Sequence, residues 1–210
     1  MDSRIQAQID KYLTTNKHGL EIGIGVRPMV EGAVTTDPNM TTYDGNKIVA
    51  HYRNRIEDLR FPNNSFDYVC MGDVLEHLPD PILGLKECQR VLKDKGTLFV
   101  LVPNNRNEMD ASRRITTLQH CIDDYKTSVT ITYNHWQEFV DEYLEPTGQT
   151  DRIEDKDRQL WNGWVHFHVW DMAGIEELFR YVFPASEILY LEDNLDIDND
   201  KILIIMEITK

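Results

Sequence analysis

Five short apolar runs mark the first half of the chain, at about residues 20–24, 33–36, 49–53, 66–71 and 97–102. Each run is too short for a typical helix and has the length of a buried strand. Polar or helix-like connections separate them, as expected for a mostly parallel sheet covered by helices on both faces. The pattern therefore predicts an α/β fold with a doubly wound sheet.

Helical periodicity marks three further segments. Residues 3–14 carry apolar side chains one turn apart and predict an amphipathic N-terminal helix. Residues 80–92 begin with Asp80 as a cap and Pro81 in the first turn, both typical of a helix start. A third helix is expected at residues 171–181. All three would belong to the layers that cover the sheet.

The alternation stops after the fifth run. Residues 104–164 are polar, helix-prone and rich in aromatic side chains, and a segment of this length between sheet elements is usually a lid or binding element. We therefore expect a helical lid or substrate-binding insertion here, within a single domain covering residues 1–210. A strand is expected at 165–169, and strands at 187–191 and 202–208 predict an antiparallel C-terminal hairpin.

Composition and charge narrow the range of partners. The chain has 210 residues, and 22 basic against 36 acidic residues give a net charge of −14. Nucleic-acid binding usually leaves a basic footprint, so this balance opposes it and favours a small-molecule or sugar ligand. No apolar run is long enough to span a bilayer and no signal pattern is present, so no membrane partner is expected. Three cysteines without a CxxC pair agree with a reduced, cytoplasmic location.

The end of the first run carries the most informative chemistry. Gly23 and Gly25 follow it, and Asp37 ends the second run, so all three would lie at the carboxyl edge of the sheet, where ligands bind. Only eight residues, 25–32, separate the two runs, which reduces the usual crossover helix to a turn. A dinucleotide needs that helix and a third glycine where this chain has Pro28. The edge is therefore predicted to bind a nucleoside without phosphates.

A series of motifs resembles the class I S-adenosylmethionine-dependent methyltransferases. The series comprises EIGIG at residues 21–25, EDLRFPNNSFD at 57–67, DVLEHLPDP at 73–81, RVLKDKG at 90–96 and VPN at 102–104. The resemblance implies a seven-stranded Rossmann-like sheet with a shortened first crossover, a methyltransferase type 11-like domain, and S-adenosyl-L-methionine as cofactor. HFHVW at 166–170 resembles a small-molecule and sugar-modifying branch, which implies methyl transfer to a hydroxyl or amine of such an acceptor.

The resemblance assigns four residues near the first two strand ends to the cofactor. Gly23 and Gly25 would admit its methionine portion and ribose, and Glu21 would support their loop through water or backbone amides. Asp37 would hold the ribose hydroxyls. Each glycine taken alone could be a plain turn, and only the combination favours a cofactor site.

Four more residues would complete the cofactor site. Asp58 would accept a hydrogen bond from the adenine amino group, with Leu59 packed on the ring. Met71 and Gly72, just past the fourth run, would line the methionine end. The alternative for Asp58 is a solvated loop acid.

Histidines are the candidates for a general base. His166 and His168 would share one strand face with Trp170, because side chains alternate along a strand. They could act as base, bind a metal, or form a packed face of satisfied imidazoles. His120 is a further base candidate, whereas the pair at 76–77 is expected to be structural or ligand-lining. No HExxH, CxxC or carboxylate cluster is present in the sequence, so no metal site is predicted.

Methyl transfer is therefore the expected function. The protein's main tasks would be alignment and placement of the acceptor next to the methyl carbon. The alternative is a non-catalytic cofactor-binding or scaffold member of the same fold, because the shortened crossover removes part of the usual cofactor wall. An NAD-dependent oxidoreductase would need the dinucleotide features that this chain lacks.

Overall fold

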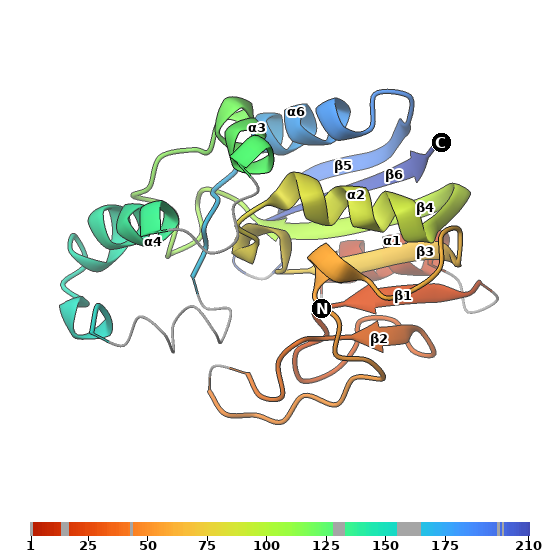
Figure 1. Cartoon of the computed structure of the whole chain (residues 1–210), viewed down its shortest axis with the longest axis horizontal. Helices are drawn as coiled ribbons and strands as arrows, with labels where there is room; N and C mark the ends of the chain where they lie inside the picture. Colours follow the sequence, from red (N-terminus) through yellow and green to blue (C-terminus); the bar gives the residue numbers. More distant parts are fainter. Residues whose placement is uncertain are drawn as a thin grey trace.

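A single mixed sheet organises the chain in the computed structural model (Figure 1). The structure describes residues 2–13, 17–42, 44–127, 133–154, 165–196, 198 and 200–210. The strands are β1 (Gly19–Ile22), β2 (Val34–Thr36), β3 (Phe66–Gly72), β4 (Leu92–Pro103), β5 (Glu187–Leu195) and β6 (Lys201–Ile208). Their order in the sheet is β2-β1-β3-β4-β6-β5. The first four strands pair in parallel, and β6 runs antiparallel to both β4 and β5. The predicted α/β fold with an antiparallel C-terminal hairpin is confirmed.

The number of strands differs from the seven expected, because the described residues form six. Residues 49–53 contribute only an isolated parallel bridge between Thr36 and Tyr52. The strand expected at residues 165–169 is also wrong. The backbone there bonds to loops instead of a neighbouring strand, with Phe167 N–H donating to the Glu76 carbonyl and Val169 N–H donating to a threonine hydroxyl.

The helices of the described residues are α1 (Ser3–Tyr12), α2 (Pro81–Val91), α3 (Leu118–Thr127), α4 (Tyr133–Phe139) and α6 (Met172–Val182). The shorter turns are η1 (Ile56–Asp58), η2 (Leu75–His77), η4 (Thr150–Arg152) and a π-helical turn, η3 (Val140–Leu144). Asp80 caps α2 by accepting a hydrogen bond from Leu83 N–H at 2.9 Å. Asp171 caps α6 in the same way, accepting from Gly174 N–H at 2.8 Å. Both caps satisfy backbone donors that helix starts leave unpaired. None of the described helices has the length and apolar content that a bilayer crossing requires.

Side-chain alternation along the central strands divides the core into two layers. On β3, Val69 and Met71 pack beneath α2, α3 and α6, whereas Tyr68 and Cys70 pack against α1. β4 and β6 alternate in the same way, and the helices accordingly lie on opposite faces of the sheet (Figure 1). Burial on both faces explains the nearly continuous apolar runs in these strands. The arrangement leaves the carboxyl ends of the parallel strands free to form a site.

The insertion has a small core of its own. Its buried apolar side chains are Trp136, Phe139, Val140, Tyr143, Leu144, Val165 and Phe167. α4 stands well away from the sheet, whereas α3 packs on α2 and α6 (Figure 1). Residues 128–132 and 155–164 of the insertion, with Trp161 and Trp164, lie outside the described residues. The aromatic pattern of the segment therefore marks a packed unit that joins the main body through α3.

Candidate active site

The turn after β1 brings its two glycines to the carboxyl edge of the sheet in left-handed conformations. Gly23 has φ of +69° and lies so close to Val74, between β3 and η2, that an added Cβ would be 2.3 Å from Cγ2 of that residue. Gly25 has φ of +56°, but an added Cβ would meet nothing within 4 Å. Glycine adopts this conformation without the steric cost that other residues meet. The first glycine is thus needed for packing, and the second faces open space.

Glu21 replaces the missing crossover helix as the support of this turn. Residues 23–33 contain no helix, as the short spacing predicts. The buried Glu21 carboxylate instead accepts hydrogen bonds from Met29 N–H at 2.6 Å and Val30 N–H at 3.0 Å. Burial raises the pKa of Glu21, and these two amide bonds oppose that rise. The placement agrees with the predicted support through backbone amides.

Asp37 joins the two strand ends. Its carboxylate accepts from Gly25 N–H at 3.3 Å and from Asn39 N–H at 2.9 Å. The side chain is buried, which raises its pKa, while the amide bonds act in the opposite direction. A carboxylate held this firmly at a strand end is well placed to accept hydrogen bonds from neighbouring hydroxyls.

A cavity of about 290 Å³ opens at this edge. Its polar lining includes Gly23, Gly25, Asp37, Arg55, Glu57, Asp73 and His77, and its apolar lining includes Ile22, Ile48, Ile56, Val74 and Leu78. The volume is at the small end of the roughly 300–1,000 Å³ found for ligand pockets. Three of these polar residues are carboxylates, so the lining suits a ligand with hydroxyls and a positive centre and disfavours one with phosphates.

Asp58, the acid expected to contact adenine, lies outside the cavity lining. The Asp58 side chain is 67% exposed, pairs with Arg60 at 3.0 Å and does not line the cavity. Glu57, one position earlier on η1, does line it. One carboxylate oxygen, Oε1, lies 3.6 Å from Nη2 of Arg55, whereas the buried Oε2 has no hydrogen-bond partner among the described residues. Glu57 therefore offers a free acceptor to a ligand.

Three other expected cofactor contacts also lie outside the cavity lining. Leu59 and Met71 are buried in the core beneath α2 and cannot pack on a ligand in this cavity. Gly72 faces the thioether of Met29, whose sulfur would lie 3.3 Å from an added Cβ. The alternation of side chains along β3 turns Met71 toward the helices, so Met71 lies outside the cavity lining although it is one residue before the end of the strand.

His77 is the histidine that the cavity contains. Its Nδ1 lies 2.8 Å from the carbonyl oxygen of Val165, so that nitrogen carries the proton and Nε2 carries the lone pair. Burial, with His166 packed against the ring at 4.9 Å, lowers the pKa of His77 to about 3. Glu76 beside it is fully buried, which raises its pKa, and its backbone carbonyl accepts from the 167–168 backbone. His77 thus lines the cavity, whereas Glu76 is buried and supports the backbone of residues 167–168.

The predicted bases His166 and His168 turn into separate environments, and neither lines the cavity. His166 Nδ1 lies 2.8 Å from Oδ2 of Asp110, which also pairs with Arg113. His168 Nε2 lies 3.2 Å from Oδ2 of Asp124, and burial lowers its pKa to about 4. His166 and His168 therefore do not form one shared strand face with a common role.

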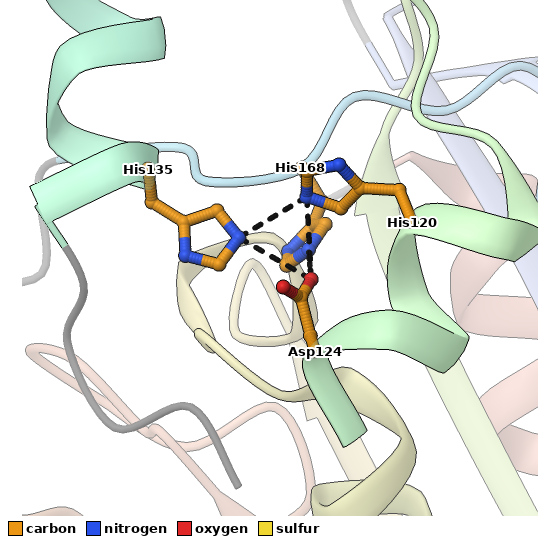
Figure 2. A group of neighbouring side chains, drawn as sticks. All are labelled: His120, Asp124, His135 and His168. Atoms are coloured by element: carbon orange, nitrogen blue, oxygen red, sulfur yellow. Dashed lines mark hydrogen bonds and ion pairs between the residues drawn. The ribbon is translucent and has the colours of Figure 1, made fainter. Parts of the chain in front are cut away.

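A second group of polar side chains gathers where the insertion meets the segment that follows it (Figure 2). It consists of His120, Asp124, His135 and His168, and we call it the histidine cluster. The sequence motifs gave no sign of a metal-type grouping, and His135 was missed entirely. The available signal was the spacing of His120 and Asp124, four residues apart and therefore on one face of a helix. The cluster brings together side chains that could hold a metal ion, in a chain for which the sequence motifs predict no metal site.

Comparison with known proteins gives this edge a context. Residues 27–100 match the family described as "Methyltransferase domain". The ubiquinone biosynthesis O-methyltransferase of Haemophilus ducreyi is 30% identical over 44% of this chain and 50% of its own length. The chain thus spans about half the length of that curated relative.

Two solved structures share the fold. A SAM-dependent methyltransferase of Methanosarcina mazei has a TM-score of 0.51 at 17% identity, covering 96% of this chain and 97% of that one. A Thermotoga maritima protein described as a SAM-dependent methyltransferase, possible histamine N-methyltransferase, has a TM-score of 0.51 at 14% identity, covering 95% and 86%. At these identities the likeness shows a common architecture.

Proposed function

We propose that this chain, a class I S-adenosylmethionine-dependent methyltransferase by its matched domain and its fold, transfers a methyl group to a hydroxyl or amine of a small molecule or sugar. The observation that carries the proposal is the cavity at the ends of β1 and β2. It combines a glycine turn, the fixed carboxylate of Asp37 and the unpaired acceptor of Glu57. These features fit an adenosine-bearing ligand without phosphates.

S-adenosylmethionine is the cofactor, and when bound it supplies a methyl group already activated by a sulfonium. Asp37 would hold the ribose hydroxyls, because its carboxylate is immobilised by two backbone amides. Glu57, instead of Asp58, would accept a hydrogen bond from the adenine amino group through its free Oε2. Gly25 leaves the space that the ligand needs, since nothing lies within 4 Å of its missing Cβ.

His77 would orient the acceptor. Its proton is fixed on Nδ1 by the Val165 carbonyl, so Nε2 can accept a hydrogen bond from an acceptor hydroxyl or amine. A pKa near 3 keeps the imidazole uncharged across the neutral range, which suits orientation better than strong proton abstraction. Methyl transfer from a sulfonium depends mainly on alignment, so orientation supplies what this reaction requires.

The insertion would close the acceptor side of the cavity. Val165, which holds His77, belongs to the same small core as Trp136 and Phe139 of α4. A change in the packing of that core would therefore reach the cavity wall through one hydrogen bond. This connection supports a lid or substrate-binding role for residues 104–164.

Binding and transfer are tested separately. Calorimetry with S-adenosylmethionine and its demethylated product measures whether the cavity holds the cofactor, and failure of both to bind would overturn the proposal. Transfer of a labelled methyl group is then assayed on a panel of sugars, phenols, quinols and amines. Cofactor binding without transfer to any member would favour the alternative, a non-catalytic cofactor-binding subunit motivated by the shortened crossover.

A further inference from the structure

Three histidines and one aspartate from distant parts of the chain converge in the histidine cluster (Figure 2). His120 and Asp124 lie one turn apart on α3, His135 lies on α4, and His168 lies on the segment that follows the insertion. One donor atom from each residue lies within 4.8 Å of the other three. None of the four residues lines the cofactor cavity, so the cluster is a separate feature.

Four of the six distances between donor atoms of the cluster match those between the ligands of a small tetrahedral ion. Oδ2 of Asp124 lies 3.2 Å from Nε2 of His120, 3.3 Å from Nε2 of His135 and 3.2 Å from Nε2 of His168. Nε2 of His120 and Nε2 of His135 are 3.2 Å apart. A tetrahedral ion with metal–ligand bonds of about 2.0–2.1 Å separates its ligands by about 3.3 Å.

Hydrogen bonds alone account for this arrangement poorly. Nε2 of His120 and of His135 both face the same oxygen of Asp124 and also face each other. A hydrogen bond between two imidazole nitrogens needs one donor and one lone pair, so the two rings cannot both donate to Asp124 and also bind one another. A single cation between them would accept a lone pair from all four side chains at once.

The surroundings also suit a bound metal ion. The side chains of His135 and His168 are 2% and 0% exposed, and His168 stacks on Trp170 with ring centroids 5.4 Å apart. His120 is 32% exposed and provides a route from solvent. Three imidazoles and one carboxylate are ligands that zinc accepts, and four protein ligands leave no open position for a substrate.

We propose that His120, Asp124, His135 and His168 bind a divalent transition metal ion of the zinc type in a closed, tetrahedral site. The ion would tie α3, α4 and the 165–170 segment together and so fix the insertion against the sheet edge. His168 N–H also contacts the Glu76 carbonyl at 3.3 Å, next to His77, so the tie ends near the acceptor side of the cavity. The site is additional to methyl transfer and does not depend on it.

The neighbouring group of Glu76, His77 and His166 is the weaker candidate, although its donor atoms also lie within 4.8 Å of one another. It offers three ligands instead of four. His77 Nδ1 already bonds to Val165, and His166 Nδ1 already bonds to Asp110. Burial raises the pKa of Glu76, so its carboxyl group favours the uncharged form, which binds metals poorly.

The test uses the untagged full chain, stripped with a chelator and reloaded with zinc. Metal content and zinc affinity are measured for the wild type and for Asp124→Asn, His120→Ala and Asp123→Asn. Asp123 is the matched control, because it is exposed on the same helix and its side chain bonds only to Gln119 among the described residues. We expect one ion per chain in the wild type and the control. Loss of a ligand should weaken zinc binding by at least about 100-fold, beyond the 10–100-fold typical of outer-sphere partners.

Cobalt and cofactor titrations complete the test. Cobalt(II) in the wild type should give the intense visible bands of a tetrahedral ion, and both ligand variants should lose them. Circular dichroism and S-adenosylmethionine affinity verify that the variants remain folded, and they keep a failed metal site distinguishable from a failed cofactor site. A wild type without bound metal would overturn the proposal. So would zinc affinity that is unchanged in both ligand variants, or metal that only His166→Ala removes.

Discussion

The cofactor edge and the histidine cluster are built in opposite ways. The edge draws its glycine turn and Asp37 from residues 21–37, a short stretch in which two adjacent strands end side by side. The histidine cluster draws four side chains from three segments spread over residues 120–168. A site made by neighbouring strand ends leaves a spacing pattern in the sequence. A site made by tertiary packing leaves almost none, and the difference explains why only the first was anticipated.

The first prediction concerns the backbone of the edge. Gly23→Ala should lower the free energy of unfolding by about 3 kcal/mol, because it adds left-handed strain of about 1–2 kcal/mol and overpacks Val74. Gly25→Ala, with open space around it, should cost only about 1–2 kcal/mol of strain while still blocking the cofactor. Chemical denaturation and cofactor titration measure the two effects. Equal destabilisation by both substitutions would contradict the distinction between a packing glycine and a ligand-facing glycine.

The second prediction separates the two sites by function. Asp37→Ala should weaken S-adenosylmethionine binding about 100-fold, equivalent to about 2.7 kcal/mol, because it removes the charged acceptor for the ribose hydroxyls. Calorimetry measures this change. Zinc affinity of the same variant should stay at the wild-type value, since Asp37 is not a member of the histidine cluster. A lower zinc affinity in Asp37→Ala would show that the cofactor cavity and the histidine cluster are coupled.

The third prediction compares Glu57, which lines the cavity, with its neighbour Asp58, which does not. Glu57→Gln should weaken S-adenosylmethionine binding about 10-fold, because it replaces the free carboxylate acceptor with a weaker amide. Asp58→Asn is the matched control, and its exposed side chain should make it neutral. If calorimetry showed weaker S-adenosylmethionine binding for Asp58→Asn and no change for Glu57→Gln, Asp58 instead of Glu57 would be the acid that contacts the cofactor.

The smallest expected effect is the contribution of His77, in the cavity wall, to the pH dependence of the free energy of unfolding. His77 has a pKa lowered to about 3 in the folded chain, against about 6.5 when unfolded, so the unfolded state binds more protons in the acid range. Stability should therefore fall as pH drops below 6.5, by about 1.2 kcal/mol between pH 7 and 5.5 for this group alone.

Denaturation curves of the wild type and His77→Gln at both pH values isolate this contribution. Glu76, whose raised pKa acts in the opposite direction, is present in both proteins and cancels in the difference. His166 and Lys201, which also face His77, are present in both proteins. Parallel curves for the two proteins would show that His77 does not titrate as its surroundings indicate.

The sequence predicted the strands, helix starts and shortened first crossover well, because the patterns that indicate them lie within short stretches of the chain. Short apolar runs marked the central strands, and Asp80 occupies the cap that its position suggested. The reduction of the first crossover followed from counting residues between strand ends.

The errors arose where the direction of a side chain depends on tertiary structure. Glu57 and Asp58 are adjacent acids on η1, and only the rotation of that turn decides which of them faces the cavity. Residues 165–169 have a strand-like composition, yet their amides bond to Glu76 and Thr116, so no strand forms. His135 joins its partners only because α4 folds back toward α3.

The bond between Glu21 and the turn amides has a consequence for selectivity in a cell. Amides in the loop after a first strand commonly hold phosphate groups in nucleotide-binding sheets. Here Met29 and Val30 already donate theirs to the protein's own Glu21 carboxyl group. ATP and its relatives bear phosphates, so we expect this loop to offer them no free amide at Met29 or Val30 and to favour an adenosine ligand without phosphates.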